Sequence, residues 1–317
     1  MKNILKIIGT ILLIIIIGVF ILLKIIEYRG NHYYNYLETE KELEKKYSQL
    51  GEYKVSFKSF EADNDVFKKY EIWYPTDLEN SNEKYPLVVV ANGTGTPASK
   101  YKAFFKHLAS WGFVVIGNED ENSRSGESSS KSLDYVLKLN EDKNSIFYNK
   151  IDTDNIGIGG HSQGGVGTIN AINNWENGKL YKAMYTASAT SPFWGQEGEL
   201  GTDWAYDVTK INIPYFFIAG TKYFDSGEAI CIEETSGQGI SPLYAMEDIY
   251  SKLTTDYKVM GRLVNIDHGE TYKKADGYMT AWFMYWLKDD LQAGNVFFGN
   301  NAEILINANW QDVKINK

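Results

Sequence analysis

The chain has 317 residues, of which 44% are hydrophobic and 15% aromatic, and its net charge at pH 7 is −9. This composition can fill a large core and differs from that of disordered chains. The acidic charge argues against a nucleic-acid partner. The single cysteine, Cys231, excludes an intramolecular disulfide and a cysteine-rich metal site.

The N-terminus carries a long apolar segment. Residues 7–23 contain no charge, and Ile25 and Ile26 extend the segment to about twenty residues, enough to cross a bilayer as a helix. No A-x-A-like cleavage site follows, so we expect residues 1–30 to be an uncleaved anchor. Lysines precede the span, and the positive-inside rule then places the body of the chain outside the cytoplasm.

The residues after this anchor are strongly charged. Acidic and basic side chains alternate between residues 37 and 50, and they predict a charged, solvated juxtamembrane spacer, which we bound at 31–50. Residues 51–317 show no internal repeat and no Pro- or Ser-rich linker, so we expect one domain there.

Strand-like and helix-like patterns alternate through this domain. The predicted strands are 53–62, 67–74, 87–90, 113–116, 156–159, 183–188, 215–219 and 259–266. The predicted helices are 100–111, 130–140, 166–175, 243–253 and 277–287. The alternation predicts an α/β fold with a mostly parallel sheet of about eight strands, covered by helices on both faces and edged by an antiparallel first pair. Residues 119–131 are expected to be a loop, and residues 225–242 a loop that forms a small cap.

One pentapeptide, Gly160-His161-Ser162-Gln163-Gly164, lies between a predicted strand and a predicted helix. It fits G-x-S-x-G, the sharp strand-to-helix turn called a nucleophile elbow. The turn holds the serine in a strained backbone conformation, and glycines two positions away avoid collisions. Ser162 is therefore the candidate nucleophile, the alternative being an idle serine in a glycine-rich turn.

A serine needs a base to become nucleophilic, and the usual base is histidine. Of four histidines, His32 lies beside the anchor. His107 is interpreted as ordinary packing on a helix surface, and His161 adjoins the serine and points away from it. His268 directly follows a predicted strand, at the end where α/β sheets place their chemistry. We predict His268 as the base.

The base in turn needs a carboxylate that fixes its tautomer. Asp225 follows the turn after the strand at 215–219, and we predict it as this acid, with Glu228 as the alternative. Asp267 adjoins His268 and cannot readily bend back to its ring. The resulting order of nucleophile, acid and base is the chain order of α/β-hydrolases.

Negative charge that develops on a carbonyl oxygen needs preorganised N–H donors. One candidate is the backbone N–H of Gln163, immediately after the serine. The other is the N–H of Thr94, in the glycine-containing segment 91–96 after the strand at 87–90. That segment lacks the lysine of a phosphate loop, and no H-E-x-x-H or comparable metal-ligand spacing occurs. We expect no cofactor and no metal.

From about residue 50 onward, the chain resembles the bacterial cutinase, polyester hydrolase and chlorophyllase-like branch of α/β-hydrolases. The resemblance rests on Asn92-Gly93-Thr94-Gly95, Leu108-Ala109-Ser110-Trp111-Gly112-Phe113-Val114-Val115, Gly160-His161-Ser162-Gln163-Gly164-Gly165 and Thr280-Ala281-Trp282-Phe283. It implies a triad and an oxyanion hole made of the residues named above. It also implies that Trp194, in Ser191-Pro192-Phe193-Trp194, lies on the substrate groove, with core packing as the alternative. That branch often has methionine where Gln163 stands, so a more polar cleft is expected here.

These observations predict a membrane-anchored serine hydrolase that cleaves a carboxylic ester through an acyl-enzyme. The expected partners are a small-molecule or lipid-like ester and, through the N-terminal helix, the cell membrane, with a monomeric catalytic domain on the extracytoplasmic side. The alternatives are an acyltransferase with the same triad, a haloperoxidase-like activity, and a catalytically silent hydrolase-fold binding module.

Overall fold

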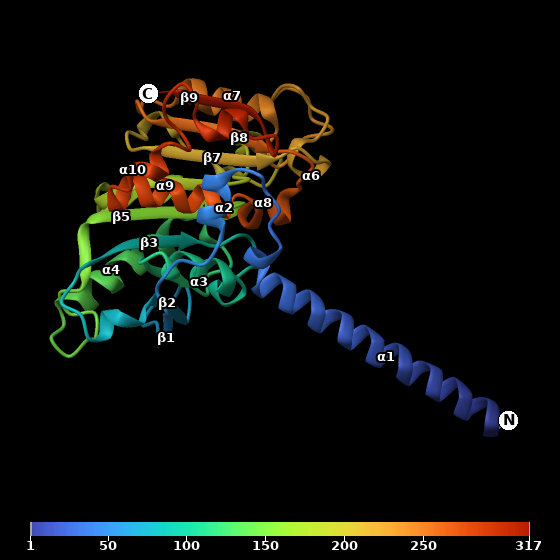
Figure 1. Ribbon diagram of the computed structural model, residues 1–317. Helices are drawn as coiled ribbons and strands as arrows, with labels where there is room; N and C mark the ends of the chain where they lie inside the picture. The colour runs from blue at the N-terminus through green and yellow to red at the C-terminus, as the bar shows by residue number, and fades with distance from the viewer. Residues whose placement is uncertain (1, 317) are drawn as a thin grey trace.

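A computed structural model describes residues 2–316, and one nine-stranded sheet runs through its body (Figure 1). The strand order is β1-β2-β4-β3-β5-β6-β7-β8-β9. The strands are β1 (Val55–Glu61), β2 (Lys69–Pro75), β3 (Tyr85–Ala91), β4 (Val114–Asn118), β5 (Ile151–His161), β6 (Tyr181–Ala187), β7 (Tyr215–Gly220), β8 (Lys258–Leu263) and β9 (Trp310–Asn316). Strands β3 to β8 pair in parallel, whereas β1, β2 and β9 pair antiparallel. The predicted fold class and its antiparallel first pair are confirmed; β9 was not predicted.

Helices cover both faces of the sheet, and alternate side chains of each central strand enter different cores. In β3, Val88 and Val90 join one core and Leu87 and Val89 the other. The first core contains residues of α3 (Lys102–Ser110) and α9 (Asp276–Lys288). The second contains residues of α4 (Glu127–Glu141), α5 (Gln163–Asn174) and α7 (Leu243–Lys252). Burial on both faces explains why these strands read as continuous β-branched runs.

Helix α4 begins earlier than the sequence predicts and takes the end of the expected loop at 119–131. It starts directly after Gly126, whose φ is +78°. A Cβ at Gly126 would collide with the backbone of Ala171 in α5. Ser128, Ser129 and Ser132 are fully buried. Small side chains let the two helices approach closely, so serines that indicate a loop by composition here belong to a packed helix.

The apolar N-terminal segment forms the helix α1 (Lys2–Asn31), which projects away from the body (Figure 1). An 18-residue stretch of its candidate span, Lys6–Asn31, has a mean hydropathy of 2.9 and contains no buried residue. At 1.5 Å per residue, such a helix is long enough to cross the roughly 30 Å apolar core of a bilayer.

The segment 31–50 differs from the solvated spacer that its charges predict. Its helix α2 (Glu42–Ser48) packs against α9, and Glu44, Tyr47 and Ser48 are buried. The Glu44 carboxylate accepts hydrogen bonds from the Trp310 indole (2.9 Å) and the Asn307 amide (2.9 Å). Positions spaced three and four apart share one helix face, so α2 buries one side while its other charges stay in water. The domain boundary at residue 50 stays a prediction.

His107 is also not the surface residue that the sequence suggests. Its side chain is fully buried, and its Nδ1 lies 2.7 Å from the Asp276 carboxylate, whose exposure is 1%. Its Nε2 donates to the Gln49 carbonyl at 2.7 Å. Tyr33 donates to the same Asp276 oxygen at 2.6 Å, and the buried Tyr34 ring stacks on the imidazole. This cluster fastens the residues that follow α1 to the helices α3 and α9.

We expect His107→Ala to lower the free energy of unfolding by about 2–4 kcal/mol, because Asp276 would stay buried without this partner. Urea denaturation of the full chain in detergent micelles, followed by tryptophan fluorescence, measures the change. His32→Ala is the matched control, since His32 is only half-buried, and its effect should stay within about 0.5 kcal/mol. Equal losses in both variants would contradict the role assigned to His107.

Candidate active site

Ser162 lies at the sharp turn between β5 and α5, as the pentapeptide predicts. Its backbone has φ 58° and ψ −124°, a conformation that residues other than glycine rarely adopt. A Cβ at Gly160 would collide with the Gly164 carbonyl, and one at Gly164 with the Ala91 carbonyl. The two glycines therefore let the turn close on itself and pack against the end of β3.

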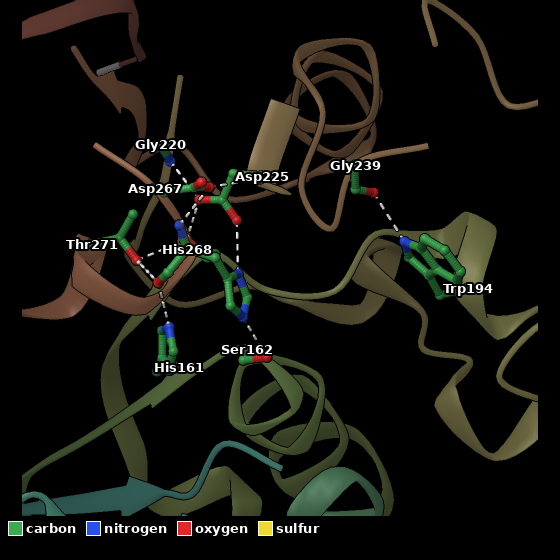
Figure 2. Close-up of polar contacts among 10 residues, drawn as sticks. His161, Ser162, Trp194, Gly220, Asp225, Gly239, Asp267, His268 and Thr271 are labelled. Carbon is green, nitrogen blue, oxygen red and sulfur yellow. Dashed lines mark hydrogen bonds and ion pairs between the residues drawn. The ribbon is translucent and has the colours of Figure 1, made fainter. Parts of the chain in front are cut away.

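His268 reaches Ser162 from a segment 106 residues further along the chain. It opens the short 3-10 helix His268–Glu270 after β8, at the carboxyl end of that strand. Its Nε2 lies 2.9 Å from the Ser162 hydroxyl oxygen, and its Nδ1 lies 2.7 Å from a carboxylate oxygen of Asp225 (Figure 2). With the proton on Nδ1, Nε2 is free to accept from the serine hydroxyl.

Asp225 is fully buried on the short helix α6 (Tyr223–Ser226), which follows β7. One of its oxygens accepts from His268. The other accepts from the Gly220 N–H and the Ser188 hydroxyl, both at 2.6 Å. These donors compensate the loss of hydration that burial imposes on a carboxylate.

The alternatives for the acid lie elsewhere in the structure. Glu228 is exposed, and Asp267 accepts hydrogen bonds from the backbone N–H groups of His268 (2.9 Å) and Asp225 (3.2 Å). Asp267 thus joins the two loops that carry the histidine and the aspartate. Sequence reasoning assigned no role to it, although an acid directly before the base in chain order could have suggested one.

Ser188 and Thr271 are further site residues that the sequence did not indicate. The Ser188 hydroxyl, besides donating to Asp225, lies 2.7 Å from the Thr271 hydroxyl, which donates to the His268 carbonyl at 3.0 Å. Ser188 has φ 48°, so its backbone is also left-handed. Small hydroxyl residues after a strand are common, and only the fold brings these two together.

His161 does not point to Ser162, as expected, but it contacts the main chain of His268. Its Nε2 lies 2.8 Å from the His268 carbonyl, which can only accept, so Nε2 carries the proton. The two imidazole rings lie 4.9 Å apart, and the Tyr272 ring lies 5.0 Å from His161. Burial, with a smaller contribution from His268, lowers the pKa of His161 to about 4. His161 is therefore neutral at pH 7.

The candidate oxyanion donors lie on the two segments that meet at the elbow. Gln163 is the first residue of α5, where a backbone N–H has no acceptor within the helix. Thr94 lies after β3, and within residues 2–316 its N–H donates to no backbone carbonyl. A Cβ on the neighbouring Gly93 would lie 3.4 Å from the His161 carbonyl oxygen, so this loop runs beside the turn.

The Gln163 side chain is fully buried, and neither its amide oxygen nor its nitrogen has a hydrogen-bond partner in the described part of the chain. It therefore does not supply the exposed polar cleft surface that the sequence suggests.

Trp194 is half-buried rather than part of the core. It lies in the 3-10 helix Pro192–Gly195, and its indole donates to the Gly239 carbonyl at 2.9 Å. In Figure 2, Trp194 lies apart from Ser162, His268 and Asp225. The indole thus holds the loop 225–242, which folds back on itself through a bridge between Gly227 and Gln238. No group of three or more potential metal ligands occurs within residues 2–316.

Comparison with known families adds one finding. Residues 42–198 match the family model described as PETase: PET hydrolase-like. The matched range begins with α2 and contains Thr94, Ser162 and Gln163, whereas Asp225 and His268 lie beyond it. None of the curated proteins matches the chain.

The lowered pKa of His161 predicts a pH dependence of stability. An unfolded histidine titrates near 6.5, so between pH 6.5 and 4 the unfolded state binds a proton that the folded state does not. Folding stability should therefore fall as the pH drops through this window, with His161 contributing about 1–3 kcal/mol of the loss. His161→Gln keeps a side-chain N–H donor but does not titrate. Denaturation of this variant between pH 6.5 and 4 should therefore show a smaller loss of folding stability than the wild type. An unchanged pH profile would show that His161 is not the group responsible.

Proposed function

Since this chain is an ester hydrolase of the α/β-hydrolase type that resembles the cutinase and polyester hydrolase branch, we propose that Ser162 is its nucleophile, His268 its base and Asp225 the acid. The observation that carries the proposal is the continuous hydrogen-bonded chain from the Ser162 hydroxyl through His268 to the buried Asp225 carboxylate. A serine, a base and an orienting acid in this order form the arrangement that activates a hydroxyl.

The reaction proceeds in two halves. The Ser162 oxygen attacks the ester carbonyl carbon while His268 Nε2 takes the hydroxyl proton, and Asp225 stabilises the resulting imidazolium. The N–H groups of Gln163 and Thr94 bind the oxyanion. His268 then protonates the departing alcohol, which leaves an acyl group on Ser162. Water, deprotonated by His268, attacks this acyl-enzyme and releases the acid.

The proposed substrate is a small-molecule or lipid-like ester. The loop 225–242, held by Trp194, borders the aspartate end of the triad and is our candidate cap. If an added alcohol outcompeted water at the acyl-enzyme, the same site would act as an acyltransferase. Measuring ester hydrolysis against acyl transfer to added alcohols separates these two activities.

We further propose that α1 anchors the protein in the cell membrane as a single span, with the catalytic domain on the extracytoplasmic side. The supporting observation is that the span is entirely unburied in the structure. An isolated apolar helix of this length is strongly unfavourable in water, so its side chains require another apolar environment. In this proposal, residues 31–50 connect the anchor to the catalytic domain 51–317.

A fluorophosphonate probe should label the protein covalently at Ser162, and Ser162→Ala should abolish the labelling. With p-nitrophenyl esters of graded chain length, Ser162→Ala and His268→Gln should lower kcat by about 10⁴- to 10⁶-fold and Asp225→Asn by about 10⁴-fold. Ser191→Ala, at a buried serine outside the hydrogen-bonded chain, is the control and should keep its activity. A folded wild-type protein that neither reacts with the probe nor hydrolyses any ester would support the binding module instead.

Deletion of residues 1–30 should move the protein from the membrane fraction to the soluble fraction, because the deletion removes the exposed apolar span. Cell fractionation of both forms, followed by blotting, measures the distribution. A full-length chain that is soluble without detergent would contradict the anchor. Protease accessibility in intact cells reports the side on which the catalytic domain lies.

A further inference from the structure

Helix α1 leaves the body near the carboxyl ends of the parallel strands, where Ser162 and His268 lie (Figure 1). A hollow at this point is lined by Ile26 and Arg29 of α1 and by Glu270 and Lys273, which follow His268 in the chain. In Figure 1, α1 and α8 (Thr271–Lys274) meet at the side of the sheet toward which the arrows of the parallel strands point. The candidate membrane span therefore leaves the body beside residues 270–273, which closely follow the proposed base His268 in the chain.

The exit of α1 is fixed to the body. Tyr33 donates to Asp276 at 2.6 Å, and Tyr34 is buried against His107. Only His32 separates these anchored tyrosines from the end of α1 at Asn31. A short, fastened connection of this kind leaves the body little freedom to rotate relative to the helix.

Exposed apolar side chains lie on the segment 223–232, which begins beside the proposed site. Tyr223, Phe224 and Ile230 expose 64%, 57% and 78% of their surfaces. The Phe224 ring lies edge-on to the His268 imidazole, with centroids 5.2 Å apart. We call Tyr223, Phe224, Ile230 and the exposed Ile232 the apolar rim. Exposed apolar residues gathered on one segment mark contact with another apolar surface.

The charges around the rim favour an apolar contact over an electrostatic one. Glu228, Glu233 and Glu234 belong to the same loop, whereas Lys222 is the basic residue that precedes Tyr223. Acidic side chains therefore outnumber basic ones in residues 222–234, and the rim is not a basic patch for anionic headgroups. Contact with the bilayer would then come from aromatic and aliphatic side chains. Full burial of each such side chain contributes about 1.5–3 kcal/mol of favourable free energy.

We propose that the apolar rim contacts the bilayer in which α1 is anchored, and that the substrate is an acyl ester of a membrane lipid. The chemistry of this inference rests on the proposed triad, and its geometry rests on the proposed anchor α1. The lipid would reach Ser162 across the rim without passing through water. Cleavage of the bond between acyl carbon and alcohol oxygen, with one water consumed, would release a fatty acid and the deacylated lipid.

The orientation is tested without catalysis. In a Cys231→Ser background, Ile230→Cys carries an environment-sensitive dye, and the full chain is reconstituted in phosphatidylcholine vesicles containing spin-labelled lipid. Leu291→Cys is the matched control, because Leu291 is also 78% exposed but opens α10 (Leu291–Gly294), at the opposite edge of the sheet (Figure 1). The dye at 230 should lose most of its fluorescence and the dye at 291 little. Equal quenching at both positions would overturn the orientation.

The substrate class is tested with two esters on the same reconstituted protein. We compare hydrolysis of phosphatidylcholine in the vesicle with hydrolysis of soluble p-nitrophenyl butyrate. Ile230→Asp should lower the ratio of lipid to soluble ester hydrolysis by about tenfold, and Leu291→Asp should leave it unchanged. Butyrate hydrolysis without lipid hydrolysis, or an unchanged ratio in Ile230→Asp, would overturn the lipid substrate while sparing the proposed function. Failure to hydrolyse either ester would overturn the proposed function, and the quenching result would still stand.

Discussion

The left-handed backbone of Ser162 is the constraint around which the rest of the site is arranged. A residue with a side chain at φ 58° costs about 1–3 kcal/mol, and the surrounding structure must hold it there. The parallel pairing of β5 with β3 and β6 fixes the strand before the turn, and the packing of α5 fixes the helix after it. The turn leaves no space for a side chain at positions 160 and 164, which are glycines. The turn therefore places Ser162 at the end of β5, where His268, in the loop after β8, reaches its hydroxyl.

The second requirement is electrostatic. A fully buried carboxylate, such as that of Asp225, is stable in the interior only when its oxygens accept hydrogen bonds. Gly220, Ser188 and His268 supply three, and Asp267 ties the loops of Asp225 and His268 together through their backbones. His161 and Thr271 both donate hydrogen bonds to the His268 carbonyl, so His268 is held by its main chain as well as by its ring. Ser188, Gly220 and Thr271 are uncharged, and the Asp267 carboxylate pairs with backbone donors.

The sequence predicts the parts of this architecture that have local signals. Hydrophobic runs indicate eight of the nine strands, and the elbow motif with four histidines narrows the candidate triad to residues that the fold brings together. Long-range packing is what local patterns do not show. The charges of α2 predict a spacer because Glu44 meets Trp310 and Asn307 only after folding. His107 likewise has no sequence neighbour that reveals Asp276, and Ser188 and Thr271 are ordinary until the sheet aligns them. Strand β9 lies beyond the last predicted helix. It is a half-exposed edge strand, and its short alternation of apolar and polar residues is too weak to predict a strand.

The buried carboxylate of Glu44 has a kinetic consequence. Its partners Asn307 and Trp310 lie 263 and 266 residues away, so the contact closes one of the longest loops in the fold. Contacts of such separation carry a large loop entropy and form after local structure. Until Asn307 and Trp310 have reached α2, the Glu44 carboxylate lacks the hydrogen bonds that they donate. The segment after α1 is therefore held both by the tyrosines beside the helix and by a contact of Glu44 that closes at a late step of folding.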